Sequence, residues 1–251
     1  MVLFASYRNE WDKLMSRKKY IVFLIIGLAL CLIWTGLGGL FSGFIRSQGG
    51  VIFNMTATPM GALPFFLQAM VPFLMFMGIS DLLTIEGAEN TMKAIVCRPV
   101  ERWKLYASKI LAVLTYAALY LLCVFILTAI LNQAFGNPLG IFELLTALLS
   151  YALTLVPLAI LACFAALIAV LGRSGTLTMF ILLVSYILLS ILPTFIPILS
   201  EVLFTSYLYW YRLWIGFLPD ATKLIHMLLI VLAYGVAFFT AGSLLFDKKE
   251  Y

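Results

Sequence analysis

A polar segment of the chain, residues 86–109, carries the side chains that could bind a partner outside a membrane. It holds five of the sixteen basic residues, which are Lys93, Arg98, Arg102, Lys104 and Lys109. Long apolar segments precede and follow it. A charged segment of this kind stays in water, because ionised side chains are strongly disfavoured in hydrocarbon. The segment is therefore a loop on one side of a membrane, where it can contact a soluble protein or lipid headgroups.

The middle of this loop is predicted to form a short helix. Asn90 or Thr91 can cap its N-terminus, and Glu86 and Glu89 lie near that end, where the helix dipole favours negative charge. Pro99 ends the helix, because a proline disfavours helical geometry at the residue before it.

The predicted helix has a compact apolar face made by Met92, Ile95 and Val96. We expect four basic side chains to surround that face, namely Arg98, Arg102, Lys104 and Lys109. One interpretation is an apolar projection that docks into a soluble protein. The other is a solvated loop whose basic side chains only meet anionic lipid. The residue types alone favour neither.

The composition places most of the chain in lipid. Of its 251 residues, 64% are hydrophobic and only 11% are charged. Spanning segments must satisfy their own backbone hydrogen bonds, and continuous apolar runs favour helices over barrel strands. We predict an all-α integral membrane protein with one domain, residues 1–251. Its six predicted spans are residues 20–44, 63–82, 110–131, 144–171, 176–198 and 224–246.

The basic residues predict the orientation of these spans. Six spans place both termini on one side, and the opposite side receives only Arg46, Arg212 and Lys223 of the sixteen Lys and Arg residues. The side that receives the rest is predicted to be cytoplasmic. The net charge of +5 therefore reflects topology, and we infer no nucleic-acid binding from it.

Residues 1–19 have the periodicity of an amphipathic helix. One face carries Phe4, Tyr7, Trp11, Leu14 and Met15, and the other carries Arg8, Asn9, Asp12, Lys13 and Ser16. This pattern suits a helix lying in the headgroup layer, which we interpret as an elbow helix that orients the first span. The alternative is a basic leader that only fixes the topology.

The segment after the fifth span is rich in aromatic residues and is interrupted by proline. The candidates for an outer gate are Pro193, Pro197, Tyr207, Trp210 and Trp214. The segment is too polar to cross a membrane and too apolar for water, so we expect it to enter the outer leaflet or lie on it. A passive belt of Trp and Tyr side chains facing the lipid is the alternative.

Several kinds of chemistry are absent from the sequence. It has no glycine-rich phosphate loop ending in Gly-Lys-Ser/Thr, so we expect no ATP or magnesium bound by this chain. It has a single histidine, His226, and no Cys-x-x-Cys pair, so a catalytic or zinc site is not expected. Asp81 is the one Asp, Glu, Lys or Arg residue in a predicted span, at its very end, and we expect it to cap or orient the neighbouring loop.

The arrangement resembles the membrane subunit of an ABC transporter of the type-2 permease family. The similar positions in the loop are Glu86 and Glu89, Asn90-Thr91, Ile95-Val96, Pro99-Val100-Glu101-Arg102, and Lys109. Asn90 departs from the pattern, because a glycine is common at that position. The broken outer segment from Pro193 to Pro219 is similar to the re-entrant helices of that family.

The resemblance implies a function for the loop. It would be a coupling helix that enters a groove on a separate ATP-binding cassette subunit, and that subunit would bind ATP and magnesium. The residues that would couple to the ATPase are Glu86, Glu89, Thr91, Met92, Ile95, Val96, Pro99 and Arg102. A second permease, identical or related, would face this one in the plasma membrane.

The resemblance and the charge-free spans predict export of an amphipathic or hydrophobic cargo, such as an antimicrobial peptide, a lipopeptide, a drug or an ion. Two other functions stay open on the sequence. One is a scaffold or sensor that recruits a soluble protein without transport. The other is a stand-alone channel or secondary carrier.

Overall fold

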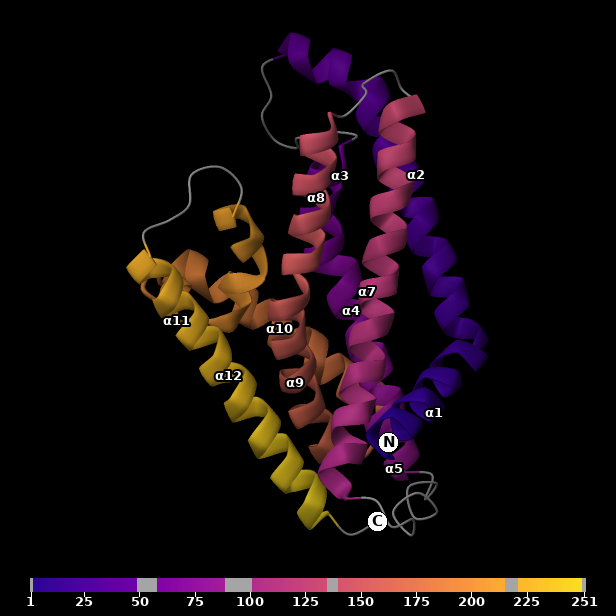
Figure 1. Ribbon diagram of the computed structural model, residues 1–251, viewed down its shortest axis with the longest axis vertical. Helices are drawn as coiled ribbons and strands as arrows, with labels where there is room; N and C mark the ends of the chain where they lie inside the picture. The colour runs from indigo at the N-terminus through magenta and orange to yellow at the C-terminus, as the bar shows by residue number, and fades with distance from the viewer. Residues whose placement is uncertain (1, 49–57, 89–100, 135–139, 215–220, 250–251) are drawn as a thin grey trace.

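The computed structural model describes residues 2–48, 58–88, 101–134, 140–214 and 221–249 (Figure 1). These residues form helices and contain no strand, as predicted. The elements are α1 (Val2–Ser16), α2 (Lys18–Gln48), α3 (Pro59–Phe65), the π-helix η1 (Phe66–Met70), α4 (Val71–Ile79), the π-helix η2 (Ser80–Ile85), α5 (Glu86–Ala88), α7 (Arg102–Ala134), α8 (Ile141–Leu153), α9 (Leu155–Leu171), α10 (Gly175–Phe195), α11 (Leu199–Val202), the 3-10 helix η3 (Phe204–Trp214) and α12 (Ala221–Lys248).

Six helical segments among the described residues are long and apolar enough to cross a membrane. Each of them overlaps one of the six predicted spans. The fifth ends at Phe195, three residues before the predicted boundary at 198. Its end lies there because Ile196 precedes Pro197 and takes an extended backbone, with φ −127° and ψ 93°.

Two of the spans are irregular, and two of their three irregularities, η1 and the break at Thr154, lie near a proline. The second span runs without a break from α3 to η2, but it includes the two π-helical stretches η1 and η2. The fourth span is divided at Thr154 into α8 and α9, three residues before Pro157. Proline supplies no amide hydrogen to the helical ladder, so an interruption is expected one turn before it.

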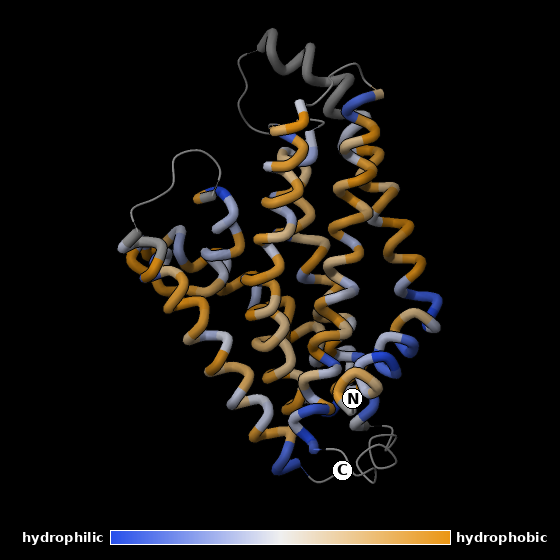
Figure 2. The backbone as a smooth tube through the Cα atoms, in the orientation of Figure 1, coloured by the Kyte–Doolittle hydropathy of each residue, from blue (hydrophilic) through white to orange (hydrophobic). Residues whose placement is uncertain are grey.

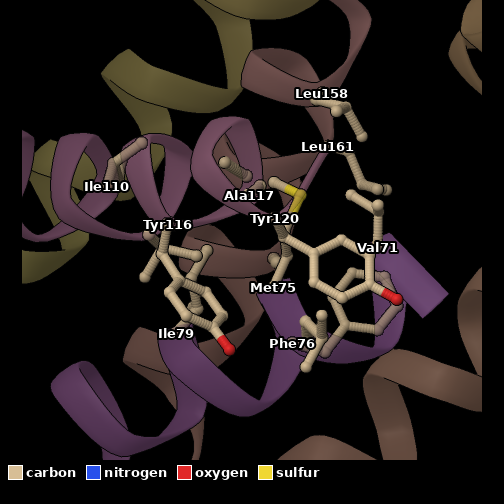
Figure 3. Packing of buried hydrophobic residues seen from close by; sticks show 14 of the residues in the cluster. Val71, Met75, Phe76, Ile79, Ile110, Tyr116, Ala117, Tyr120, Leu158 and Leu161 are labelled. Atoms are coloured by element: carbon tan, nitrogen blue, oxygen red, sulfur yellow. The ribbon is translucent and has the colours of Figure 1, made fainter. Parts of the chain in front are cut away.

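The centre of the bundle is formed by α4, α7 and α9. Figure 3 shows Met75 of α4 and Ala117 of α7 near Leu161 of α9, and all three side chains are fully buried. The face of α9 that meets the neighbouring helices is rich in alanine, with Ala162, Ala165, Ala166 and Ala169 all at 0% exposure. Small side chains let membrane helices approach closely, so α9 serves as the packing axis of the bundle.

The two ends of the bundle differ in polarity. Figures 1 and 2 show α1, α5, the start of α7 and the end of α12 at one end, where hydrophilic residues gather. We call this the basic end. α2 and α12 lie on opposite sides of the bundle in Figure 1. Long apolar stretches between the ends leave Leu229, Leu232 and Val236 of α12 more than 60% exposed, as expected for side chains that face lipid.

Gly242 of α12 gives a test of this packing. A methyl group at that position would overlap the Tyr106 hydroxyl and lie 2.8 Å from Cζ of the same ring. Gly242→Ala should therefore lower the free energy of unfolding by about 1–3 kcal/mol, the range for overpacked cores. Thermal unfolding of the purified protein in detergent measures this change.

Two variants make the test specific. Tyr106→Phe should restore part of the loss, because the Tyr106 hydroxyl has no hydrogen-bond partner within the described residues. Gly36→Ala is the matched control: a methyl group there meets nothing within 4 Å, so it should be neutral or slightly stabilising. Equal losses at both glycines would contradict the packing described here.

Candidate functional site

Four charged side chains form a closed cluster at the basic end. We call Glu10, Lys13, Glu86 and Lys109 the ion-pair cluster. The Lys109 ammonium donates to Glu10 Oε2 at 2.9 Å and to Glu86 Oε2 at 2.5 Å. The Lys13 ammonium donates to Glu10 Oε1 at 2.9 Å and to Glu86 Oε1 at 3.1 Å. Each carboxylate therefore binds both lysines, and the cluster has no net charge.

Three elements meet in this cluster. Glu10 and Lys13 lie one turn apart on α1, Glu86 begins α5 directly after η2, and Lys109 lies in the second turn of α7. Residues 86–109 are the predicted coupling loop, so Glu86 and Lys109 are its two ends. The direct contact between them closes the loop at its base, and α1 holds the closed base in place.

Further contacts hold α1 against α7. The hydroxyls of Ser6 and Ser108 are 3.0 Å apart, and the Tyr7 hydroxyl donates to Thr115 Oγ1 at 3.2 Å. Leu14 of α1 is fully buried. The helix at residues 2–16 thus lies against the third span, while its predicted role as an elbow stays a prediction.

Three of the four side chains in the ion-pair cluster are buried, and Lys13 is half-buried. Glu10 and Lys109 are each 1% exposed and Glu86 is 4% exposed. Burial alone raises the pKa of the Glu10 carboxyl, but the charges of Lys109 and Lys13 outweigh it and hold that pKa below its ordinary value. Burial alone lowers the pKa of Lys13, and the carboxylates of Glu10 and Glu86 outweigh it and raise that pKa. Both groups thus stay ionised at neutral pH.

Asp81 forms a second buried contact at the same end. Its carboxylate accepts a hydrogen bond from the Tyr20 hydroxyl and pairs with Lys19 and with Arg17, whose Nη1 is 3.3 Å away. The Tyr116 hydroxyl of α7 donates to the Tyr20 carbonyl at 2.9 Å. Asp81 thus binds the junction between α1 and α2. Its expected role in capping or orienting the neighbouring loop stays a prediction.

The π-helix η2 also contacts the ends of α9 and α10 that lie at the basic end. Ser80 Oγ donates to the Gly175 carbonyl at 2.7 Å, and Thr84 Oγ1 donates to the Ala169 carbonyl at 2.9 Å. The Lys249 ammonium donates to the Val170 carbonyl at 2.6 Å. The last carbonyls of a helix have no partner within it, so these side chains complete the end of α9.

Arg102, at the end of the predicted coupling loop, contacts the C-terminal end of α12. Its guanidinium donates to the Asp247 carbonyl, and its Nε lies 3.8 Å from the Asp247 carboxylate. Both side chains are largely exposed, at 37% and 67%. Arg102 is therefore accessible to a partner while it touches α12.

The structure locates only part of the predicted coupling residues. Glu86 and Arg102 are described, whereas Glu89, Thr91, Met92, Ile95, Val96 and Pro99 lie outside the described residues. One expectation was wrong. Lys109 does not surround the apolar face of the loop, because it is buried between Glu10 and Glu86. Lys13, which lies on the predicted polar face of residues 1–19, binds the same two carboxylates.

The sequence contains a signal for the ion-pair cluster, although the two faces predicted for residues 1–19 leave it out. Glu10 lies three residues after Tyr7 and four before Leu14, so helical periodicity places it within the apolar face of α1. A carboxylate in that position needs a buried cation. The identity of that cation, Lys109, is not visible in the sequence.

At the other end of the bundle, η3 packs inside the protein. Tyr207, Trp210 and Tyr211 are 6%, 6% and 2% exposed, so their side chains do not form a belt facing lipid. Pro193 lies in the last turn of α10, and Pro197 is exposed between α10 and α11. The side chain of Trp214 lies outside the described part. Whether this segment enters the membrane as a re-entrant element stays a prediction.

A cavity of about 270 Å³ lies between the second span, α10 and η3. Pro193 lines it, but Tyr207 and Trp210 do not. Its polar lining consists of Gln68, Tyr186, Ser190, Thr205, Ser206 and Tyr209. Hydroxyl and amide groups at this place can bind a polar group, whereas the described residues include no cluster of His, Cys, Asp or Glu suited to a metal ion.

The ion-pair cluster predicts a pH dependence of stability. The pKa of Glu10 is lowered below 4.5, so its contribution is complete above that pH and is lost as the pH falls through the lowered pKa. Glu10→Gln should be less stable at pH 7, and its melting temperature should then fall less steeply on acidification from pH 5 to pH 3.

Thermal unfolding in detergent across this pH range is the measurement. Asp12→Asn removes an exposed carboxylate of the same helix and serves as the control, since it should keep the profile of the unmodified protein. A Glu10→Gln profile parallel to that of the unmodified protein would show that Glu10 does not stabilise the fold through its charge.

The comparisons with known proteins agree with this geometry. Residues 7–190 match the family described as "ABC-2 family transporter protein". That range covers well over half of the chain, and it includes most of α1, the whole predicted coupling loop and all four residues of the ion-pair cluster. No curated protein matches the chain. The chain is a multi-pass membrane protein that belongs to the ABC-2 family of transporter proteins.

Proposed function

We propose that this chain is the membrane-spanning permease subunit of an ATP-driven exporter. A separate ATP-binding cassette subunit supplies the energy and binds ATP and magnesium, and this chain hydrolyses nothing itself. A second permease, identical or related, completes the transporter in the plasma membrane, with both termini of this chain cytoplasmic. The observation that carries the proposal is the family match, which includes the loop and the helices that hold it.

The ion-pair cluster supports a mechanical role for the loop. A loop transmits a displacement only if its ends are fixed to the helices that must move. Here Lys109 and Glu86 bind each other, and both bind α1. Removing one partner of a buried ion pair costs about 3–5 kcal/mol, so the joint resists local opening. A force on the loop therefore moves α1, η2 and α7 together.

The contacts of η2 carry the same displacement to the second half of the bundle. Ser80 and Thr84 bind carbonyls of α10 and α9, so the ends of these helices at the basic end follow η2. A methyl group at Gly175 would lie 2.5 Å from Ile85 Cγ1, so the chains approach closely at this turn. The loop thus acts on α1 and α7, and also on α9 and α10, through short, directional contacts.

The interior supports an amphipathic or hydrophobic cargo. Lys109 and Asp81, the charged residues buried within the described spans, lie at the basic end. The cavity beside α10 offers hydroxyl and amide groups without charge. An antimicrobial peptide, a lipopeptide or a drug combines apolar surface with such polar groups, and an ion is the remaining candidate. A scaffold or sensor, or a secondary carrier, is the alternative function.

The proposal predicts a physical complex with an ATPase. Replacing Ile95 and Val96 with Asp together should abolish copurification of the ATP-binding subunit, because two carboxylates would enter an apolar contact. Affinity purification of the tagged chain from its host membranes, followed by a measurement of ATP hydrolysis, tests this. The amount of chain in the membrane should not change.

The matched control places the same substitutions at the opposite end of the bundle. Ile141 and Phe142 are 80% and 86% exposed there, and replacing both with Asp should leave the ATPase bound. An ATPase retained by the Ile95/Val96 variant would refute docking through the loop. An ATPase that binds but is never stimulated by any cargo would favour the scaffold or sensor, and cargo movement without an ATPase would favour the carrier.

Arg102 gives a second test, directed at coupling. Arg102→Glu should preserve membrane insertion and lower the amount of cargo moved per ATP hydrolysed, because it reverses a charge beside the docking surface. Transport into membrane vesicles, measured together with ATP hydrolysis, gives that ratio.

The contact with Asp247 requires a control for this variant. The double variant Arg102→Glu/Asp247→Arg reverses the ion pair, and we expect it to remain uncoupled, since the exposed pair at 3.8 Å is worth at most about 1 kcal/mol. Recovery of full coupling in the double variant would instead assign Arg102 to holding α12. Unchanged coupling in Arg102→Glu alone would remove Arg102 from the site.

A further inference from the structure

Beyond the first helical position, four prolines lie inside the helical spans, namely Pro64, Pro72, Pro157 and Pro193, and each withdraws an amide hydrogen from the helical ladder. In a regular helix, each amide donates to the carbonyl four residues earlier. Pro72, Pro157 and Pro193 cannot donate, so the carbonyls of Gln68, Leu153 and Leu189 lose this regular donor. In a membrane no water replaces it, and an unsatisfied carbonyl there costs several kcal/mol.

Each of these three carbonyls accepts a hydrogen bond from a side chain on another element of the chain. The Trp210 indole Nε1 donates to the Leu153 carbonyl at 2.7 Å. The Thr205 hydroxyl donates to the Leu189 carbonyl at 3.1 Å. The Tyr186 hydroxyl donates to the Gln68 carbonyl at 3.1 Å. A side-chain donor thus takes the place of the missing amide at Pro72, Pro157 and Pro193, three of the four prolines inside the spans.

The donors are buried side chains of the outer half of the bundle. Trp210, Tyr186 and Thr205 are 6%, 6% and 5% exposed. Trp210 and Thr205 both belong to η3, so two of the three hydrogen bonds fix this one segment to α8–α9 and to α10. Tyr186 makes the same kind of contact between α10 and the second span.

The segment η3 needs such contacts because its own hydrogen bonds hold it poorly. It is an 11-residue 3-10 helix, a geometry with weak hydrogen bonds that rarely extends beyond one turn. Pro193 and Pro197 also interrupt the chain that leads to it from α10. Local structure therefore does not determine where η3 lies against the bundle.

We propose that Trp210 and Thr205 are positioning residues, which hold the outer segment η3 on backbone carbonyls left free by Pro157 and Pro193. Tyr186 uses the carbonyl left free by Pro72 to fix α10 to the second span. In this arrangement the prolines leave carbonyls free to bind η3, and the interruptions of the helices are a consequence. Trp210 is therefore a structural anchor of the outer segment, and its indole is not available to cargo. The inference requires that this chain span a membrane, as members of its family do. It does not depend on coupling of the chain to ATP hydrolysis.

If the proposal is right, each side-chain donor stabilises the protein only while the corresponding proline is present. Trp210→Phe keeps an aromatic ring and removes the N–H group. It should raise the unfolding equilibrium constant about three- to fifteenfold, the range measured for hydrogen bonds between membrane helices. Pro157→Ala returns a backbone amide that can donate to the Leu153 carbonyl. In that background, the loss caused by Trp210→Phe should be smaller by about that factor, because only the loss of ring packing remains.

Amide hydrogen exchange of residues 204–214 gives a second, local readout in the same four proteins. Trp210→Phe should accelerate exchange in this segment while α4 and α7 keep their protection, and Pro157→Ala should remove the acceleration. A general loss of stability would accelerate exchange in all helices alike. The matched control is Trp103→Phe, because Trp103 is exposed, donates to the Glu101 carboxylate and is far from Pro157 in the chain.

Equal losses from Trp210→Phe in both backgrounds would overturn the proposal, because the indole would then act by packing alone. If Pro157→Ala does not fold, Thr205→Val and Pro193→Ala provide the same comparison at the other carbonyl. Valine keeps the shape of threonine without the hydroxyl, so its cost should also disappear when the proline is removed. A Thr205→Val cost that is independent of Pro193 would refute the proposal at that site.

Discussion

The mutual neutralisation of two lysines and two glutamates at the basic end, three of them buried and Lys13 half-buried, is the interaction on which the rest of the structure depends. Lys109 and Glu10 are each 1% exposed, and a buried charge without a partner is strongly disfavoured. Together the four side chains balance, and each carboxylate binds both ammonium groups. These contacts join α1, the end of the second span and the start of the third span. The loop between those spans is closed at this junction.

The same physical demand, that no polar group be left without a partner in lipid, explains the other end of the bundle. There the polar groups are backbone carbonyls, and the partners are an indole and two hydroxyls. At the basic end the last carbonyls of α9 are completed by Thr84 and Lys249. The bundle is thus apolar in its middle and held at both ends by specific polar contacts, which is a suitable construction for a body that moves as a unit.

The sequence predicted the parts of the fold that depend on composition and periodicity. Long apolar runs located six helices, and the periodicity of residues 2–16 predicted the helix whose Leu14 is buried. Basic residues such as Arg17 and Lys249 pointed to one end, because charge asymmetry is a property of the chain itself. These predictions needed no knowledge of which helix contacts which.

The parts that could not be predicted depend on contacts between distant residues. Lys109 and Glu10 are 99 residues apart, and nothing local shows that they meet. The sequence placed Lys109 in the loop, and only the packing of α1 against α7 shows that it is buried. In the same way, Trp210 was a candidate gate by its residue type, and its carbonyl partner lies 57 residues earlier. The π-helix η2 also follows from packing, because no residue pattern in Ser80–Ile85 marks it.

The pairing of Pro157 with Trp210 imposes an order on the way this protein can change over generations. If the proline is lost first, the helix regains its own donor, and the tryptophan is then free to vary. If the tryptophan is lost first, a carbonyl in lipid is stranded, and the intermediate is impaired. Related chains should therefore include some that lack both residues or the proline alone, whereas chains with the proline and no donor opposite it should be rare. Evolution through this pair runs more easily in one direction than in the other.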